Sequence, residues 1–186
     1  MNISCDCRKF KARLLGFPKN SPGRLVCYCL ACRTYLEKID RADLLDEFGG
    51  TEIIPAYPNE IEITQGRDLL KCNWLTKNGT YRWTTTCCNS PIANTKGVFP
   101  WAGIVHSAYT NEDSAALEKF GKVRCRVFGR DAFANAPSNI SNSIKLKDLL
   151  VVIPFVMKGK ILRKGHNSPF LRSDNATPIS RPEVLE

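Results

Sequence analysis

Hydrophobic and polar residues alternate over short stretches through much of the chain, a pattern typical of β-strands. Segments rich in β-branched and aromatic residues are separated by Pro, Gly and Asn-Gly, and they lie at 52–57, 59–66, 69–76 and 80–88. Asn78-Gly79, between the last two segments, predicts a β-hairpin that leads the chain into Cys87 and Cys88. Earlier in the chain, 3–16 and 23–29 read as strand, loop and strand, with a Pro/Gly/Ser turn at 17–23. The pattern predicts a mainly β protein of antiparallel sheets.

Helical spacing of apolar residues is confined to a few segments, so we expect two or three short helices. One is predicted over 41–48, with Asp40 or Asp43 as the N-cap and Gly49-Gly50 as the stop. A second is predicted over 111–120, capped by Asn111 or Asp113 and closed by Gly121. A polar spacer at 134–143 precedes an apolar helix or strand at 146–157.

The chain of 186 residues is long enough for one domain with a proper core and an extension. We expect a zinc-binding β domain over 1–135 and a C-terminal extension over 136–186, packed on the domain or trailing from it. The N-terminus has no apolar signal region, and the longest apolar run, 149–157, is short and interrupted by Pro154. These features predict a cytoplasmic protein without a membrane partner.

The chain has nine cysteines and a formal net charge of +9, and both limit the kinds of site and of binding partner that we expect. An odd number of cysteines without an export signal argues against a disulfide framework and favours a metal site or reactive thiols. The positive charge suits nucleic acid, an anionic surface or an acidic small molecule. Because the basic residues are interspersed rather than clustered, a solvated surface remains the simpler interpretation.

The spacing of seven cysteines is that of metal ligands. Residues two apart on a strand point to one face, which lets Cys5 and Cys7, and likewise Cys27 and Cys29, converge on one ion. A tight turn in C-x-x-C folds Cys32 back toward Cys29. Three thiolates leave a fourth zinc position open for water or substrate, whereas four close the site. Buried apolar cysteines are the alternative interpretation.

The other four cysteines and His106 are expected in different places. Cys88 is expected to complete the Cys5–Cys7 set, with Cys87 as a possible fourth ligand, although adjacent strand residues face opposite ways unless a turn intervenes. Cys72 and Cys125 lie singly in apolar strand-like runs and are expected in the core. His106 lies in a similar run and is expected in the core or at an edge, with a general base or fourth ligand as the alternative.

These motifs resemble those of a known family. A C-x-C near the N-terminus, then C-x-C-x-x-C-R, then "ITQGRDLLK", then an aromatic/Arg strand ending in cysteines and Ser-Pro-Ile is similar to the glutathione-dependent formaldehyde-activating enzymes, which include centromere protein V relatives. The resemblance covers about residues 3–95, and the triple-cysteine motif is its most specific part. It implies a β-tent fold built from small antiparallel sheets around zinc.

The resemblance also implies that the cysteines form two zinc sites with different roles. Cys5, Cys7 and Cys88 would belong to a structural zinc, and Cys27, Cys29 and Cys32 to a second, reactive zinc from which glutathione can displace a ligand. The family's later C-x-x-C-G would put a cysteine at position 85 and Gly after the second cysteine, but Thr85 and Asn89 stand there. Cys87 would then substitute, or the structural site is incomplete. The tail beyond Lys96 has no counterpart in short members of the family.

The resulting hypothesis is a carbon-sulfur lyase or synthase acting on S-hydroxymethylglutathione or a similar thiol adduct, with zinc as cofactor. Arg8, Lys9 and Arg33 are candidate anchors for the anionic tripeptide, or else ordinary surface charges. A non-catalytic zinc-stabilised binding module for an acidic partner or nucleic acid is the alternative, although aromatics are not interleaved with the basic residues. A thiol redox role for Cys29 and Cys32 lacks the thioredoxin context.

Overall fold

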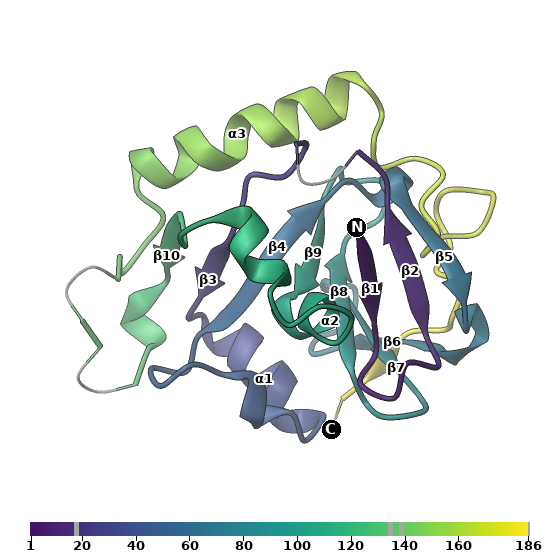
Figure 1. The fold of residues 1–186 in the computed structure, drawn as a ribbon, viewed down its shortest axis with the longest axis horizontal. Coiled ribbons are helices and arrows are strands. Elements are labelled where there is room, and N and C mark those ends of the chain that lie inside the picture. The colour runs from purple at the N-terminus through teal and green to yellow at the C-terminus, as the bar shows by residue number, and fades with distance from the viewer. Residues whose placement is uncertain (17–18, 134–135, 138–139, 186) are drawn as a thin grey trace.

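The computed structural model describes residues 1–16, 19–133, 136–137 and 140–185. Within these residues the chain forms eleven β-strands in two sheets and three α-helices (Figure 1). The prediction of a mainly β fold is confirmed. The predicted turn at 17–23, the spacer at 134–143 and the domain limit at 135 include residues outside the described part.

An eight-stranded sheet carries most of the fold, in the order β10-β3-β4-β9-β8-β7-β6-β11. Its strands are β3 (Leu25–Cys27), β4 (Thr51–Ala56), β6 (Leu70–Trp74), β7 (Tyr81–Thr85), β8 (Pro91–Thr95), β9 (Ala102–Val105), β10 (Cys125–Val127) and β11 (Glu183–Val184). Central neighbours pair antiparallel, as expected, but β10 runs parallel to β3 and β11 parallel to β6. Both edge strands return after long connections, which is what parallel pairing requires.

A second sheet of three strands, in the order β1-β2-β5, lies against one face of the first. It consists of β1 (Asn2–Ser4), β2 (Lys11–Leu14) and β5 (Ile61–Gln65). Alternation along the strands directs one face of each sheet inward, where Ile54, Trp83 and Ile104 meet Phe10 and Ile3 in the largest buried cluster. This apolar burial stabilises the fold and leaves the other face of the large sheet to be covered by helices.

The predicted helix over 41–48 is wrong. The helix there is α1 (Leu30–Lys38), which begins directly after Cys29, and only a 3₁₀ turn follows at Ala42–Leu44. Asp40 has a left-handed φ of 56°, so it follows the end of a helix rather than capping the start of one. The sequence pattern therefore predicts helical structure in this part of the chain, but it does not show that the helix begins directly after Cys29.

The predicted helix over 111–120 is also displaced. The structure has α2 (His106–Thr110) and a separate 3₁₀ turn at Ala116–Phe120, which Gly121 ends with a φ of 67°. The Asn78-Gly79 hairpin is confirmed, since β6 and β7 pair antiparallel on either side of it.

The C-terminal apolar segment is a helix, α3 (Leu146–Ile161), which runs along one side of the molecule (Figure 1). Phe155 anchors it, because its ring stacks on Tyr57 with 4.1 Å between centroids and its carbonyl accepts a hydrogen bond from the Tyr57 hydroxyl. Lys164, just beyond α3, forms an ion pair with Glu60. Among the described residues, no helix combines the length and apolarity needed to cross a membrane.

Candidate metal centres

Four cysteine sulfurs from two distant segments meet in one cluster. Cys5 and Cys7 follow β1, while Cys87 and Cys88 lie between β7 and β8, and all four sulfurs lie within 4.8 Å of one another. The Cys5–Cys7, Cys5–Cys87, Cys7–Cys87 and Cys87–Cys88 sulfurs are separated by 3.6, 3.8, 3.3 and 3.7 Å. A tetrahedral zinc with bonds of about 2.3 Å to sulfur needs edges of about 3.8 Å. The four-cysteine cluster therefore has the donor set and spacing of a closed metal site.

A turn brings the adjacent Cys87 and Cys88 to the same side. β7 ends at Thr85, the amide of Asn89 donates to the Thr85 carbonyl at 3.0 Å, and Asn89 takes a left-handed φ of 56°. Because this turn removes the strand alternation, both thiols can face Cys5. Cys5 itself is buried, and its sulfur accepts a hydrogen bond from the amide of Phe10 at 3.3 Å.

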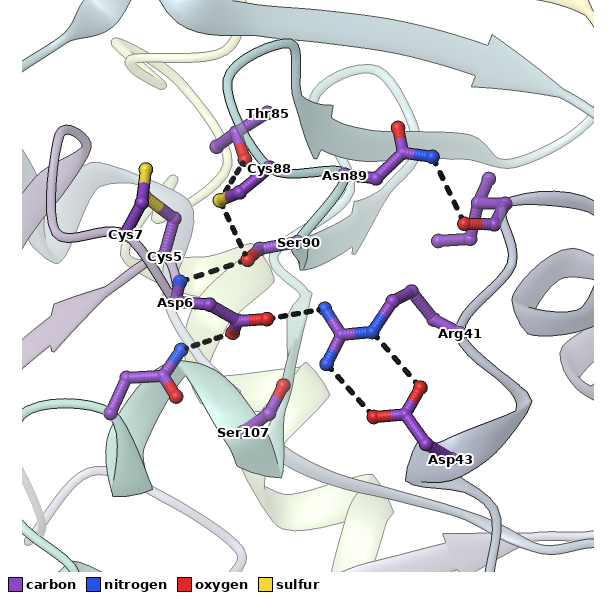
Figure 2. A network of polar contacts seen from close by, with 12 residues as sticks. Cys5, Asp6, Cys7, Arg41, Asp43, Thr85, Cys88, Asn89, Ser90 and Ser107 are labelled. Carbon is purple, nitrogen blue, oxygen red and sulfur yellow. Dashed lines mark hydrogen bonds and ion pairs between the residues drawn. The ribbon is translucent and has the colours of Figure 1, made fainter.

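A polar network holds the two cysteine segments together around this cluster (Figure 2). The amide of Asp6 donates to the Ser90 hydroxyl at 2.9 Å, and that oxygen lies 3.2 Å from the Cys88 sulfur. The carboxylate of Asp6 pairs with Arg41 at 2.7 Å, and Arg41 also pairs with Asp43. Such outer hydrogen bonds orient metal-binding side chains and reduce the freedom they lose when a metal binds.

Thr85 stands where the resemblance calls for a cysteine. Its side chain is buried, and its hydroxyl lies 3.5 Å from the Cys88 sulfur. Burial opposes ionisation of Cys88, but hydrogen bonds from Ser90 and Thr85 outweigh it and lower the pKa of Cys88 to about 6. Thr85 thus supports the Cys88 thiolate, while Cys87 brings the fourth sulfur.

A second cluster consists of Cys27, Cys29 and Cys32, whose sulfurs also lie within 4.8 Å of one another. Cys27 ends β3, Cys29 is the N-cap residue of α1, and Cys32 lies in the first helical turn. The Cys27 and Cys29 sulfurs are 3.3 Å apart, and the amide of Cys32 donates to the Cys29 carbonyl at 3.0 Å. Within the described chain this three-cysteine cluster has three sulfur donors, so a tetrahedral metal would keep one position for another ligand.

The three-cysteine cluster favours one thiolate, that of Cys29, while hydrogen bonds from Cys29 together with burial raise the pKa of Cys27 and Cys32. Hydrogen bonds from the thiols of Cys27 and Cys32 lower the pKa of Cys29 well below its usual value. The start of α1 adds its partial positive charge, because its first amides point toward this end of the helix. Deprotonated sulfur is the form that binds metal.

Arg82, on β7, is the charged residue that the sequence did not single out. It is buried, its guanidinium lies over the Tyr35 ring at 4.8 Å, and its charge favours the thiolate forms of Cys29 and Cys32. Among the described residues, the Tyr35 ring is the partner found for the Arg82 guanidinium, with neither an ion pair nor a hydrogen bond. A buried cation without a counter-ion is costly, so an anionic group at the neighbouring cluster would compensate it.

The other candidates occupy separate places. Cys72 and Cys125 are buried, as predicted for core residues. His106 is half-buried at the start of α2, its Nδ1 lies 3.3 Å from the Glu52 carbonyl oxygen, and neither cysteine cluster includes it. These surroundings agree with an edge histidine.

The proposed tripeptide anchors have protein partners of their own. Arg8, beside the four-cysteine cluster, donates to the Asn111 carbonyl at 3.2 Å. Arg33, beside the three-cysteine cluster, donates to the Asp131 carbonyl at 2.7 Å and lies over the Phe133 ring. Lys9 is exposed in the loop between β1 and β2. Arg33 is therefore the anchor candidate adjacent to the three-cysteine cluster.

Comparison with known proteins gives a family but no activity. The model of the "Family of unknown function (DUF6151)" matches residues 1–181. No curated protein matches the chain significantly. A crystal structure of a Rhodobacter sphaeroides protein is similar over 66% of this chain and 97% of its own, with 16% identity and a TM-score of 0.44.

Proposed function

Because the chain belongs to DUF6151, a protein family of unknown function, we propose its function from its own cysteine clusters: a zinc protein that forms or cleaves a carbon-sulfur bond in a thiol–carbonyl adduct such as S-hydroxymethylglutathione. The observation that carries the proposal is the pairing of a four-cysteine cluster with a three-cysteine cluster. A closed thiolate set is typical of structural zinc, and a set of three is typical of a site with an exchangeable ligand. The resemblance to glutathione-dependent formaldehyde-activating enzymes supports the same division.

Zinc fits the donors better than the oxygen-preferring divalent metals. All seven donors are thiols, which exclude the oxygen-preferring Mg²⁺ and Ca²⁺, and the sulfur separations of 3.3 to 3.8 Å suit a tetrahedron. In this proposal Cys87 takes the place of the cysteine missing at position 85, so the structural site is complete.

The residues of the three-cysteine cluster would prepare a thiol for reaction. Zinc, when bound there, supplies the positive charge that holds an incoming thiol as its thiolate at neutral pH. Cys27, Cys29 and Cys32 leave that thiol one position, and Arg82 offsets the negative charge that the sulfurs accumulate. The thiolate sulfur then bonds to the carbonyl carbon, the C=O electron pair moves to oxygen, and the oxygen takes a proton from solvent.

Purified protein is expected to contain about two zinc ions per chain, one for each cluster. With glutathione present, it should accelerate aldehyde consumption above the protein-free rate, tested with formaldehyde and with phenylacetaldehyde. Elemental analysis and carbonyl assays measure the two parts separately. Two zincs without acceleration for either aldehyde would reject catalysis and favour the zinc-stabilised binding module.

Arg82→Met is expected to have a large effect on metal affinity and a small effect on the stability of the metal-free protein. Loss of the guanidinium should weaken metal binding at the three-cysteine cluster about ten-fold or more, as removal of outer groups does at other metal sites. The metal-free protein should lose no more than about 1 kcal/mol of unfolding free energy, because an uncompensated buried charge disappears. Competition with a chromophoric chelator and chemical denaturation measure the two effects.

Arg13→Met is the matched control, since Arg13 is exposed and pairs with Glu62 away from the clusters. It should change neither quantity. Equal metal affinity in Arg82→Met and wild type would contradict the role of this charge.

A further inference from the structure

A partly open cavity of about 210 Å³ adjoins the three-cysteine cluster. Its wall includes Cys27 itself, together with the apolar side chains of Leu25, Ile53, Trp101, Leu149 and Val152. β3, β4, β10 and the segment before β9 form the sheet side of the wall, and α3 covers it. The cavity thus lies between the large sheet and the C-terminal helix.

The cavity offers little to a charged ligand. Its wall is apolar apart from the thiols of Cys27 and Cys125 and the carboxylate of Asp148. Asp148 already accepts a hydrogen bond from the amide of Lys145 at 2.9 Å and thereby caps the start of α3. A polar or ionised group moved into this space would lose hydration without replacement.

The register of β3 and β4 links this cavity to the cluster. Leu25 and Cys27 are two residues apart on β3 and therefore share a sheet face. Thr51 on β4 pairs directly with Cys27, so its side chain lies on that face as well. The Thr51 hydroxyl oxygen is buried and has no hydrogen-bond partner among the described residues. Thr51 is not part of the cavity wall, so the contact between the cavity and the three-cysteine cluster is Cys27 itself.

We propose that this cavity binds the apolar part of the carbonyl substrate, an aldehyde with a phenyl-sized or branched aliphatic side chain. The inference rests on the proposed function and names its substrate class. The thiol partner would lie at the three-cysteine cluster with its body outside the cavity, and the carbonyl group of the aldehyde would lie at the Cys27 end of the cavity.

The size and polarity of the cavity indicate which reactant it binds, the carbonyl compound or the thiol. A dry cavity of about 150 Å³ is large enough for benzene in another protein, so about 210 Å³ accommodates a phenyl ring with a short linker. Formaldehyde has no side chain to fill this space. Glutathione is charged at both ends, and an apolar wall cannot replace the hydration of those charges.

The proposed reaction moves charge onto the carbonyl oxygen. When the thiolate sulfur bonds to the carbonyl carbon, the C=O electron pair moves to that oxygen. The oxygen then takes a proton from solvent, which replaces the proton released when the thiol ionised. No oxidation or reduction takes place.

Toluene binding tests the cavity without any chemistry. Zinc-loaded protein should bind toluene with a change in tryptophan fluorescence, because Trp101 is part of the wall. Val152→Trp fills the cavity and should weaken toluene binding at least ten-fold, and Leu149→Phe provides a second filling variant if the first fails to fold. Ile153→Trp is the matched control, because the neighbouring Ile153 side chain is exposed on the same helix, and it should stay within two-fold of wild type.

Aldehyde kinetics test the substrate class. With glutathione, wild-type kcat/KM should be at least ten-fold higher for phenylacetaldehyde than for formaldehyde, and Val152→Trp should lower the phenylacetaldehyde value at least ten-fold. Absence of toluene binding, equal binding to Val152→Trp, or a preference for formaldehyde would overturn the inference. Toluene binding that Val152→Trp removes, without turnover of either aldehyde, would support the apolar ligand site and reject the proposed function instead.

Discussion

Cys5→Ser is expected to remove one of the two zinc ions and to lower the thermal midpoint by about 10 °C or more, equivalent to about 3 kcal/mol or more for a chain of this size. Cys5 is fully buried, and its sulfur lies 3.8 Å from that of Cys87, 82 positions away. A metal at the four-cysteine cluster therefore joins the N-terminal strands to the β7–β8 turn. Structural zinc contributes about 10–16 kcal/mol of apparent binding free energy in small zinc domains, as much as the whole stability of a typical protein.

Cys72→Ser is the control that isolates the metal from the substitution itself. Cys72 is equally buried, so its replacement carries a similar cost of placing a hydroxyl in the core, about 1–3 kcal/mol. It belongs to neither cluster and should keep both zinc ions. Calorimetry and elemental analysis measure the two variants side by side. Full zinc content in Cys5→Ser would reject the four-cysteine site.

The strands and most of the clustering of the cysteines can be predicted from the sequence because they depend on local spacing. Alternation and the Asn78-Gly79 signal predict the β6–β7 hairpin, and C-x-C-x-x-C needs only a strand end and a turn to gather its sulfurs. The meeting of Cys5 with Cys87 joins residues 82 positions apart, and it followed from counting thiols that lacked partners. Local patterns thus indicate which cysteines can form a cluster but not how the distant segments approach one another.

The errors concern helix boundaries next to functional turns. Apolar spacing after Cys32 placed a helix at 41–48, but α1 begins at Leu30 because the cysteine turn itself starts the helix. Asp40, expected as an N-cap, lies beyond the end of α1 with φ of 56°. Aspartate tolerates both positions, so its identity alone does not distinguish a helix start from a helix end.

The surroundings of Arg82 and Thr51, and the presence of the cavity, depend on tertiary contacts. These contacts join segments far apart in the sequence, so no short stretch of sequence predicts them. Alternation places Arg82 on the opposite side of β7 from Trp83, yet the sequence does not say that Tyr35 of α1 covers that side. Thr51 lies beside Cys27 only because β3 and β4 pair, and the cavity exists only because α3 returns over β3. A buried arginine or hydroxyl without a partner is visible only once burial is known.

Cys32→Ser should have the opposite profile from Cys5→Ser, with little effect on stability and a large effect on reaction. The three ligands lie within residues 27–32, so a metal there closes only a short loop and constrains the unfolded chain little. The thermal midpoint should fall by less than half as much as in Cys5→Ser. Zinc content should fall by one ion. Glutathione-dependent consumption of whichever aldehyde the wild-type protein consumes faster, formaldehyde or phenylacetaldehyde, should fall at least 100-fold.

Ala31→Ser is the matched control for this variant, because it introduces the same hydroxyl at an exposed position in the same helical turn. It should retain two zinc ions and full activity. Cobalt substitution gives a readout independent of turnover: the sulfur-to-metal absorption assigned to the three-cysteine cluster should disappear in Cys32→Ser and remain in Ala31→Ser. If Cys32→Ser kept its activity after losing one metal, the reaction would have to occur away from this cluster. Retention of both metals would instead remove Cys32 from the ligand set.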